Sequence, residues 1–190
     1  MESFYTFSRK VGSRSVVEIR PAGDVKFSDV DQYLRTTSRY QLQNDVLFEV
    51  ARGCKWTDII YYHGAAHLKF YSKKMVDILN NFVNLEGKMY PIKIINDVIR
   101  EYYVLYNLDT FQFLNKKEML NGEKYALFKL PTDIPNLFTL TNSNMCICSQ
   151  ALKDALEHQK ITNIEFSQYT YGLSQMEYIK WKNGLLIFNR

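Results

Sequence analysis

The sequence contains few cysteines, which limits the ways in which it could be stabilised. Its 190 residues include Cys54, Cys146 and Cys148 and no other cysteine. An odd and low number of cysteines argues against a disulfide framework and is typical of a reducing compartment. Cys146 and Cys148 have no second Cys/His pair that would complete a tetrahedral metal site. We therefore expect them to pack as small apolar side chains.

The sequence also lacks segments that direct a protein into or across a membrane. The N-terminus has no basic start followed by an apolar run, so it does not have the form of a signal peptide. No apolar stretch approaches the roughly 20 residues that a membrane-spanning helix needs. These absences predict a soluble, cytoplasmic protein with no membrane partner.

Signatures of nucleotide and nucleic-acid binding are missing as well. The chain has neither a Gly-x-Gly-x-x-Gly pattern nor a phosphate-binding P-loop. The net charge is +4, and the Lys and Arg residues are scattered along the sequence. Proteins that bind nucleic acid usually gather these residues on one face. We therefore predict no nucleic-acid partner and no nucleotide cofactor.

Histidine and cysteine give only a weak indication of a metal or catalytic site. His63 and His67 are spaced as two metal ligands on one helix would be. However, no glutamate lies between them, and Gly64 weakens the helix that this arrangement needs. We predict no metal, no cofactor and no catalytic residue. The alternative is a small enzyme of unrecognised class with a centre made of Cys54, His63 and His67, because catalytic partners meet in space rather than in sequence.

The composition that is present is that of a globular protein with a full core. Hydrophobic residues make up 46% of the chain, charged residues 23% and aromatic residues 15%. Because Tyr and Phe favour pleated, half-buried surfaces, the aromatic content favours a fold rich in strands. We expect a single domain over 1–190, with a possible N-terminal strand/helix lobe over 1–44, a core over 45–166 and a C-terminal hairpin over 167–190.

Apolar patterning predicts an α+β fold made of mostly antiparallel twisted sheet with a few short helices. Strands 4–7 and 16–19 could form a hairpin, and strands 89–95 and 102–108 are expected to pair as another. One short helix with loops is expected over 53–64. The remaining expected elements are a helix over 28–40, strands over 45–50, 125–130, 138–140 and 145–148, and a final hairpin over 178–188.

A strand–helix–strand pattern occurs twice. The first copy spans Leu68–Ile95 and the second begins at Met145 and ends at Phe166. Ser72 matches Ser149 at an offset of 77 residues (149 − 72 = 77), and the pairs Met75/Leu152, Asp77/Asp154 and Leu79/Leu156 share that offset. Each serine is placed to cap a helix whose apolar stripe would lie on the sheet. We therefore expect two similar units packed on the sheet, serving as scaffold.

The best candidates for binding a partner lie just before the first copy. Trp56, Tyr61, Tyr62 and His63 combine large aromatic contact area with polar tips, which is the profile of residues that dominate protein interfaces. The competing interpretation, that Trp56 and one tyrosine belong to the core, has about equal weight.

The order of these motifs resembles that of a known group of proteins. The motifs are Asp45-Val-Leu-Phe, Trp56-Thr-Asp, Lys69-Phe-Tyr-Ser-Lys-Lys-Met-Val-Asp-Ile-Leu, Tyr102-Tyr-Val-Leu-Tyr-Asn-Leu followed by Asp109, Met145-Cys-Ile-Cys-Ser-Gln-Ala-Leu-Lys-Asp-Ala-Leu and Ile161-Thr-Asn-Ile-Glu-Phe. Together they resemble immunity proteins of bacterial polymorphic toxin systems, families eleven and forty-three and their relatives, in which glycine often stands where this chain has Asn163. The resemblance implies an α+β protein without catalytic residues that binds and neutralises a cognate toxin protein of the same bacterium.

Overall fold

The structure is a computed structural model that describes residues 3–10, 14–23, 47–96, 98–105, 108–111, 114–120, 123–129, 134–140 and 145–170. Its described part is an α+β fold with many strands and two helices, which confirms the predicted class. The sheets differ in detail from the expected mostly antiparallel twisted sheet, because six strands close into a barrel that includes two parallel pairs. The helix expected over 28–40 and the hairpin expected over 178–188 lie outside the described residues.

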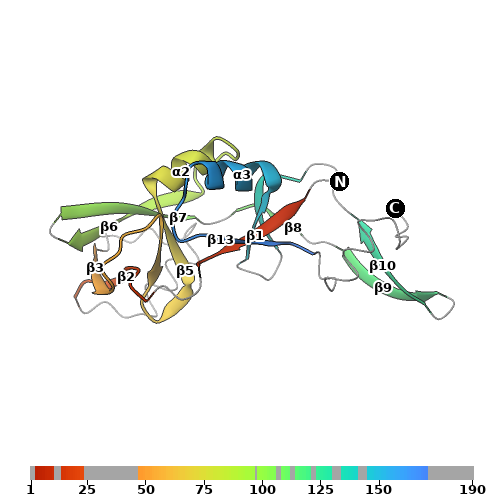
Figure 1. Cartoon of the computed structure of the whole chain (residues 1–190), viewed down its shortest axis with the longest axis horizontal. Coiled ribbons are helices and arrows are strands. Elements are labelled where there is room, and N and C mark those ends of the chain that lie inside the picture. The colour runs from red at the N-terminus through yellow and green to blue at the C-terminus, as the bar shows by residue number, and fades with distance from the viewer. Residues whose placement is uncertain are drawn as a thin grey trace.

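The barrel forms one half of the molecule (Figure 1). Its antiparallel pairs are β2–β3, β6–β7, β7–β5 and β5–β4, while β3–β6 and β2–β4 are parallel and close the ring. Phe48 and Phe70 are fully buried and their ring centroids lie 5.8 Å apart. The strands are β2 (Glu18–Pro21), β3 (Leu47–Arg52), β4 (Ile59–Tyr62), β5 (Ala65–Ser72), β6 (Met89–Asn96) and β7 (Val98–Leu105).

A five-stranded sheet lies beside the barrel, in the order β13-β1-β12-β11-β8. All its pairs are antiparallel except β11–β8. Two further strands, β9 and β10, pair only with each other among the described strands. These strands are β1 (Phe4–Ser8), β8 (Thr110–Phe111), β9 (Leu114–Leu120), β10 (Glu123–Lys129), β11 (Leu137–Leu140), β12 (Cys146–Ser149) and β13 (Glu165–Gln168).

Two expectations about local structure are wrong. The strand over 4–8 does not form a hairpin with the strand over 18–21, because β1 pairs with β12 and β13 whereas β2 pairs with β3 and β4. The segment 53–64 contains the strand β4 rather than a helix. All four β4 residues are buried and belong to the hydrophobic core, so neither face of the strand is exposed. A strand buried on both faces shows no alternating pattern that would distinguish it from a helix.

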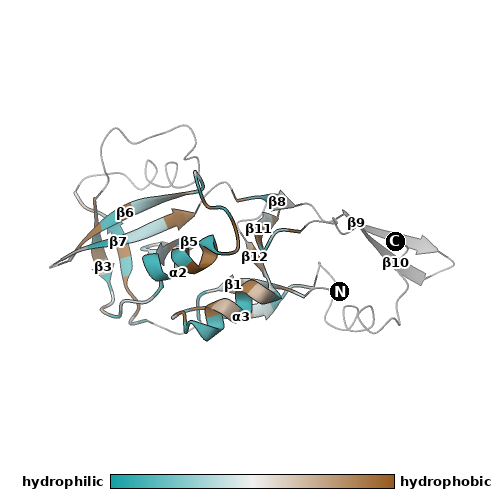
Figure 2. Cartoon of the chain, turned by 90° about the horizontal axis from the view of Figure 1, so that it is seen from above, coloured by the Kyte–Doolittle hydropathy of each residue, from teal (hydrophilic) through white to brown (hydrophobic). Residues whose placement is uncertain are grey.

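The two helices predicted for the repeated pattern both form, and serines cap them as expected. Helix α2 (Lys73–Asn80) follows β5 directly, and helix α3 (Gln150–His158) follows β12. The hydroxyl oxygens of Ser72 and Ser149 accept hydrogen bonds from the backbone N–H groups of Met75 and Leu152, each at 3.2 Å. The two helices lie along the same side of the molecule, and each has a polar and an apolar face (Figures 1 and 2).

The repeated unit is larger than the sequence indicates. In each copy an antiparallel hairpin leads into the capping serine and its helix: β4–β5 leads into α2, and β11–β12 leads into α3. After each helix comes a buried aliphatic residue, Leu85 or Ile161, and then a residue with left-handed backbone, Gly87 (φ 65°) or Asn163 (φ 62°). The offset between these last two residues is 76 (163 − 87 = 76). Because α2 ends at Asn80 and α3 at His158, six residues (81–86) precede Gly87 and four (159–162) precede Asn163, so the loop after α2 is the longer one by two residues.

Candidate functional site

Two of the predicted partner-binding residues belong to the core. The side chains of Tyr61 and Tyr62 are 2% and 3% exposed. The Tyr61 hydroxyl accepts a hydrogen bond from the Asn163 amide nitrogen at 3.4 Å. Burial raises the pKa of Tyr61 to about 12, so its hydroxyl keeps its proton at neutral pH. In this structure Tyr61 joins the barrel to the second copy of the repeat, and both tyrosines are buried in the core rather than presented to a partner.

Trp56 lies at the surface, in the connection between β3 and β4. Its indole is half-buried, the Arg100 guanidinium carbon lies 4.5 Å from its ring centroid, and the Tyr102 ring lies 6.0 Å away on the inner side. Arg100 itself is exposed. The Tyr102 hydroxyl donates a hydrogen bond to the carbonyl of Thr57, the residue after Trp56, at 2.8 Å. This bond fixes the backbone beside the indole. Stacked Trp and Arg side chains are typical of interface anchors.

His63 is also exposed, at the end of β4, and it contacts a charged cluster instead of Trp56. Its Nδ1 lies 2.9 Å from a Glu18 carboxylate oxygen, while Arg52 binds the other oxygen of the same carboxylate. Burial alone would raise the pKa of Glu18, but the hydrogen bonds from His63 and Arg52 outweigh it and hold the pKa below its ordinary value. Trp56 contacts β7 and His63 contacts β2, so the structure does not bring these two candidates into contact.

The alternative Cys/His centre is only partly described. Cys54 and His63 are exposed, and the side chain of His67 lies outside the described residues. Cys146 and Cys148 are buried, as predicted, and burial raises the pKa of Cys148 to about 12. Both of these cysteines are therefore thiols at neutral pH and act as core residues. Within the described ranges, no three His, Cys, Asp or Glu side chains are arranged to hold a metal ion.

A polar clamp joins the two copies of the repeat at Asp58, the residue before β4. The Ser72 hydroxyl donates to one Asp58 carboxylate oxygen at 2.7 Å. The Thr162 N–H and hydroxyl donate to the other at 2.8 and 2.7 Å, and the Asp58 N–H donates to the Thr162 hydroxyl oxygen at 2.8 Å. Asn163 adds a hydrogen bond to the Ile59 carbonyl at 2.8 Å. The loop after α3 thereby closes tightly on the start of the first hairpin.

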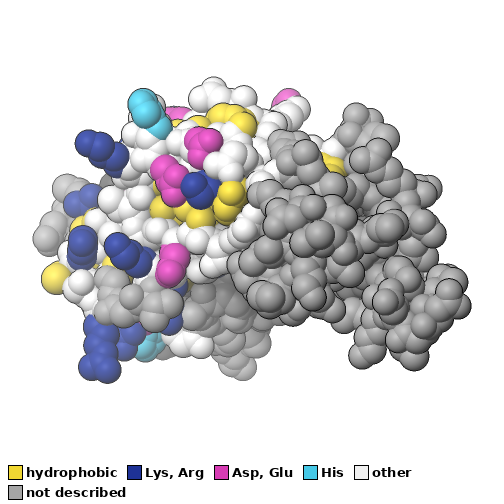
Figure 3. Space-filling model, turned by 45° about the vertical axis from the view of Figure 1, so that its right-hand side comes forward, with side chains coloured by type: hydrophobic (Ala, Val, Ile, Leu, Met, Phe, Trp, Pro, Cys, Tyr) yellow, Lys and Arg dark blue, Asp and Glu magenta, His cyan; other side chains and the backbone are white. Residues whose placement is uncertain are grey.

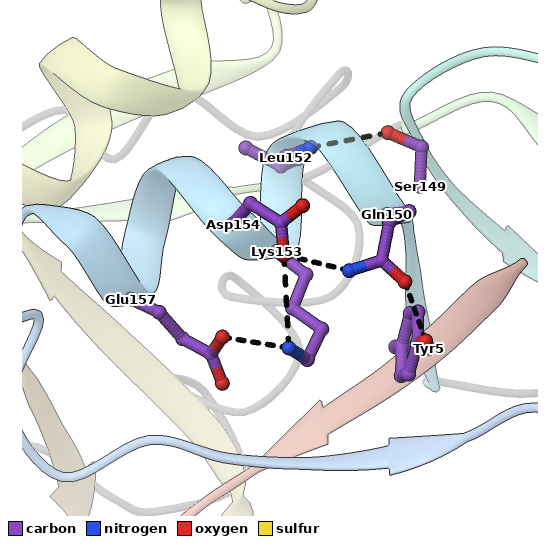
Figure 4. Close-up of polar contacts among 7 residues, drawn as sticks. All are labelled: Tyr5, Ser149, Gln150, Leu152, Lys153, Asp154 and Glu157. Carbon is purple, nitrogen blue, oxygen red and sulfur yellow. Dashed lines mark hydrogen bonds and ion pairs between the residues drawn. The ribbon is translucent and has the colours of Figure 1, made fainter.

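The corresponding junction of the second hairpin, at Asn136, is looser. Asn136 stands before β11 as Asp58 stands before β4, and it accepts a hydrogen bond at 2.6 Å from the hydroxyl of its own capping serine, Ser149. Its contact with the loop after α2 is a single hydrogen bond, from the amide nitrogen to the Phe82 carbonyl at 3.3 Å. Figure 4 shows Ser149 at the start of α3. In this helix the Gln150 side chain accepts a hydrogen bond from the Tyr5 hydroxyl, and the Lys153 ammonium donates one to the Glu157 carboxylate.

A pocket of about 220 Å³ opens at this looser junction. Lys88 and Asp109 form an ion pair at its edge, with Nζ and Oδ1 2.9 Å apart. Their side chains are 28% and 54% exposed, so the pair is accessible to a ligand. The apolar part of the lining is made of Phe82, Val83, Leu85, Leu108, Pro135 and Leu137, and Asn84 and Asn136 complete it.

Sequence reasoning did not find this pocket or the clamp. Asp58 and Asn136 each lie just before a strand and 13 or 14 residues before a capping serine, a spacing visible in the sequence once the repeat is extended toward the N-terminus. Lys88 and Asp109 are 21 residues apart and carry no motif. Only the fold brings them to one pocket.

The chain was also compared with known proteins. No family model matches the sequence, and no curated protein matches it. Among the described residues, no helix has the length and apolar character needed to cross a membrane.

Proposed function

We propose that this chain is an immunity protein that acts in the cytoplasm by binding a cognate bacterial toxin and blocking it. The proposal rests first on the order of motifs from Asp45 to Phe166 that resembles toxin-immunity proteins. In the structure these motifs make the framework: they supply both helix caps and the Asp58–Thr162 clamp.

The observation that carries the proposal is the stacked pair of Trp56 and Arg100 at the surface. A half-buried indole under an exposed guanidinium offers a partner both an apolar surface and hydrogen-bond donors, and such residues supply most of the binding energy of many interfaces. His63, held by Glu18, is a second accessible candidate on the same barrel. Tyr61 and Tyr62 are buried and are not part of this surface.

The charge of the protein leaves the class of toxin open. On the face drawn in Figure 3, both basic and acidic side chains occur, together with hydrophobic patches. An inhibitor of a nuclease often presents an acidic face to the basic nucleic-acid channel, and the net charge of +4 gives no support for that arrangement.

Co-expression with the product of the adjacent gene tests the proposal. The expected result is a complex that copurifies and cells that survive a toxin that otherwise stops growth. Arg100→Ala is expected to weaken the complex at least about fivefold, because it removes an exposed anchor without opening the core. Cys54→Ala is the matched surface control and should protect as the wild type does; loss of protection on this change alone would favour the Cys/His enzyme. A neighbour that is not toxic, or one that forms no complex, contradicts the proposal.

A further inference from the structure

The two junctions of the repeat place equivalent segments against each other, but only one of them is filled. At Asp58, the Thr162 side chain and backbone occupy the junction with three hydrogen bonds. At Asn136, the longer loop after α2 makes one hydrogen bond, and a pocket of about 220 Å³ remains. The chain thus supplies its own occupant at one junction and leaves space at the other.

The size and walls of the pocket suit one aromatic ring. A dry protein cavity of about 150 Å³ is large enough to bind benzene, and this pocket exceeds that volume. Its walls include the aliphatic side chains of Val83, Leu85, Leu108 and Leu137. Leu85 and Leu137 are almost fully buried, at 0% and 1% exposure, and so lie behind the accessible apolar wall, which the half-buried Phe82, Val83, Leu108 and Pro135 provide.

The polar groups at the edge narrow the choice to a ring that carries a hydroxyl. Asp109 offers a carboxylate acceptor that is more than half exposed, and Lys88 offers an ammonium donor beside it, 2.9 Å away. A phenolic O–H can donate to the first and accept from the second. A phenyl ring could do neither, and an indole N–H could only donate.

We propose that this pocket receives a tyrosine side chain from the toxin. The inference rests on the proposed function for the identity of the partner, and on the pocket alone for the chemistry. The phenol ring fills the space between the loop after α2 and the start of β11, and its hydroxyl joins the Lys88–Asp109 pair. Tyrosine is among the residues that most often anchor interfaces in desolvated pockets.

The first experiment uses the isolated protein and p-cresol, which has the side-chain structure of tyrosine. Titration followed by NMR is expected to shift signals of the pocket residues, and toluene serves as the ligand without a hydroxyl. Asp109→Ala should weaken p-cresol binding about fivefold while leaving toluene binding unchanged, because a single hydrogen bond is lost. If p-cresol shifts no pocket signal up to its solubility limit, the inference is overturned whatever the toxin does.

The second experiment fills the pocket. Val83→Trp places an indole in the space, and Asn81→Trp adds the same side chain two residues away at an exposed position that does not line the pocket. Thermal unfolding first establishes that both variants fold. Val83→Trp is expected to abolish p-cresol binding and to weaken the toxin complex about thirtyfold or more, the effect of losing a strong anchor. Asn81→Trp is expected to match the wild type in both assays.

The outcomes separate the pocket from the proposed function. If folded Val83→Trp binds the toxin as tightly as the wild type, the pocket is not the anchor site, although the protein is still a toxin inhibitor. If the wild type dimerises and Val83→Trp makes it monomeric, a second copy of this chain is the occupant and the inference is wrong. If the wild type forms no complex with the toxin, the proposed function fails, and the p-cresol titration alone decides whether the pocket binds a phenol.

Discussion

Replacing Thr162 with valine removes a hydroxyl group that contacts Asp58 from 104 residues away in the sequence. This hydroxyl donates to the Asp58 carboxylate at 2.7 Å and accepts from the Asp58 N–H at 2.8 Å. Valine keeps the branched shape of threonine, so the change tests the hydrogen bonds with little change in packing. Asp58→Asn tests the other partner, because its Oδ1 can still accept from Ser72 while its NH₂ group would face two donors of Thr162.

The expected magnitudes follow from the number of bonds and their exposure. A hydrogen bond to a charged group contributes about 1.5–3 kcal/mol when well buried. Thr162 is exposed and Asp58 is only partly buried, so water competes for these groups and we halve the contribution. Thr162→Val should lower the free energy of unfolding by about 1–2 kcal/mol, and Asp58→Asn by about 1.5–3 kcal/mol. Because both changes break the same contacts, the double variant should lose about 1 kcal/mol less than the sum.

Urea unfolding of the wild type, the two single variants and the double variant measures this coupling. The slope of free energy against urea concentration should stay constant, which would show that the variants change stability rather than compactness. If the effects of the two substitutions add to within about 0.3–0.5 kcal/mol, the clamp contributes nothing beyond two independent contacts and the reasoning is refuted.

Acid provides an independent check of the same clamp. Burial alone would raise the pKa of Asp58, but the hydrogen bonds from Ser72 and Thr162 outweigh it, so its pKa in the folded protein lies below the ordinary value of 3.8. The unfolded chain therefore takes up this proton first, and the stabilisation is complete above that value and is lost as the pH falls through the folded pKa. The stability difference between wild type and Asp58→Asn should accordingly shrink on acidification below about pH 4.

Four further predictions concern single positions. Gly53 has φ +82°, and a Cβ there would lie 2.2 Å from the Val16 carbonyl oxygen. Gly53→Ala should therefore lower the free energy of unfolding in urea by about 3 kcal/mol or more. Gly64→Ala, at φ +86° in open space, should lower it by about 1 kcal/mol. Ser149→Ala should cost about 1–2 kcal/mol by the same assay, since it removes a helix cap and a partner of Asn136. Asn163→Ala should lower the Tm more than Asn163→Gly, because glycine adopts φ 62° without the strain that alanine would carry. Equal losses would show that the lost side-chain hydrogen bonds dominate. Glu18→Gln should flatten the acid limb of the curve of stability against pH. The lowered pKa of Glu18 gives the wild type a stabilisation that is complete above the ordinary value of 4.5 and is lost as the pH falls through the folded pKa. An unchanged acid limb contradicts this.

Features that depend on neighbouring residues could be predicted from the sequence. The two capped helices, the 77-residue offset and the hairpin of β6 with β7 all follow from local patterns, and the structure has them in place. Asn163 has a left-handed backbone like its counterpart Gly87 in the first copy. Both residue types tolerate that conformation, so the sequence difference leaves the turn intact.

Features that depend on pairing between distant segments of the chain could not be predicted from the sequence. Closure of the barrel requires the parallel pairs β2–β4 and β3–β6, and nothing local in these short strands specifies which partner lies alongside. The strand Ile59–Tyr62 cannot be distinguished from a helix by its sequence for a related reason, since burial on both faces removes its alternation. The same burial removes Tyr61 and Tyr62 from the accessible surface, because aromatic composition alone does not show which ring faces the core.

Only part of the candidate site could be predicted from the sequence. Trp56 and His63 were found from residue type, and both reach the surface. Arg100, which stacks on Trp56, is 44 residues away (100 − 56 = 44) and becomes a neighbour only through the pairing of β5 with β7. The pocket lies beside the loop after α2, which is longer than the loop after α3, and this difference has meaning only when the two junctions are compared in three dimensions.

The central claim is that this protein acts by binding a toxin. The most direct test is isothermal titration of the purified chain with the purified product of the adjacent gene. The activity of the toxin is followed in parallel. The account predicts a stoichiometric complex, loss of toxin activity in proportion to complex formed, and weaker binding by Arg100→Ala. A toxin that remains fully active in the presence of saturating protein, or that is inactivated by catalytic amounts of it, would contradict the account.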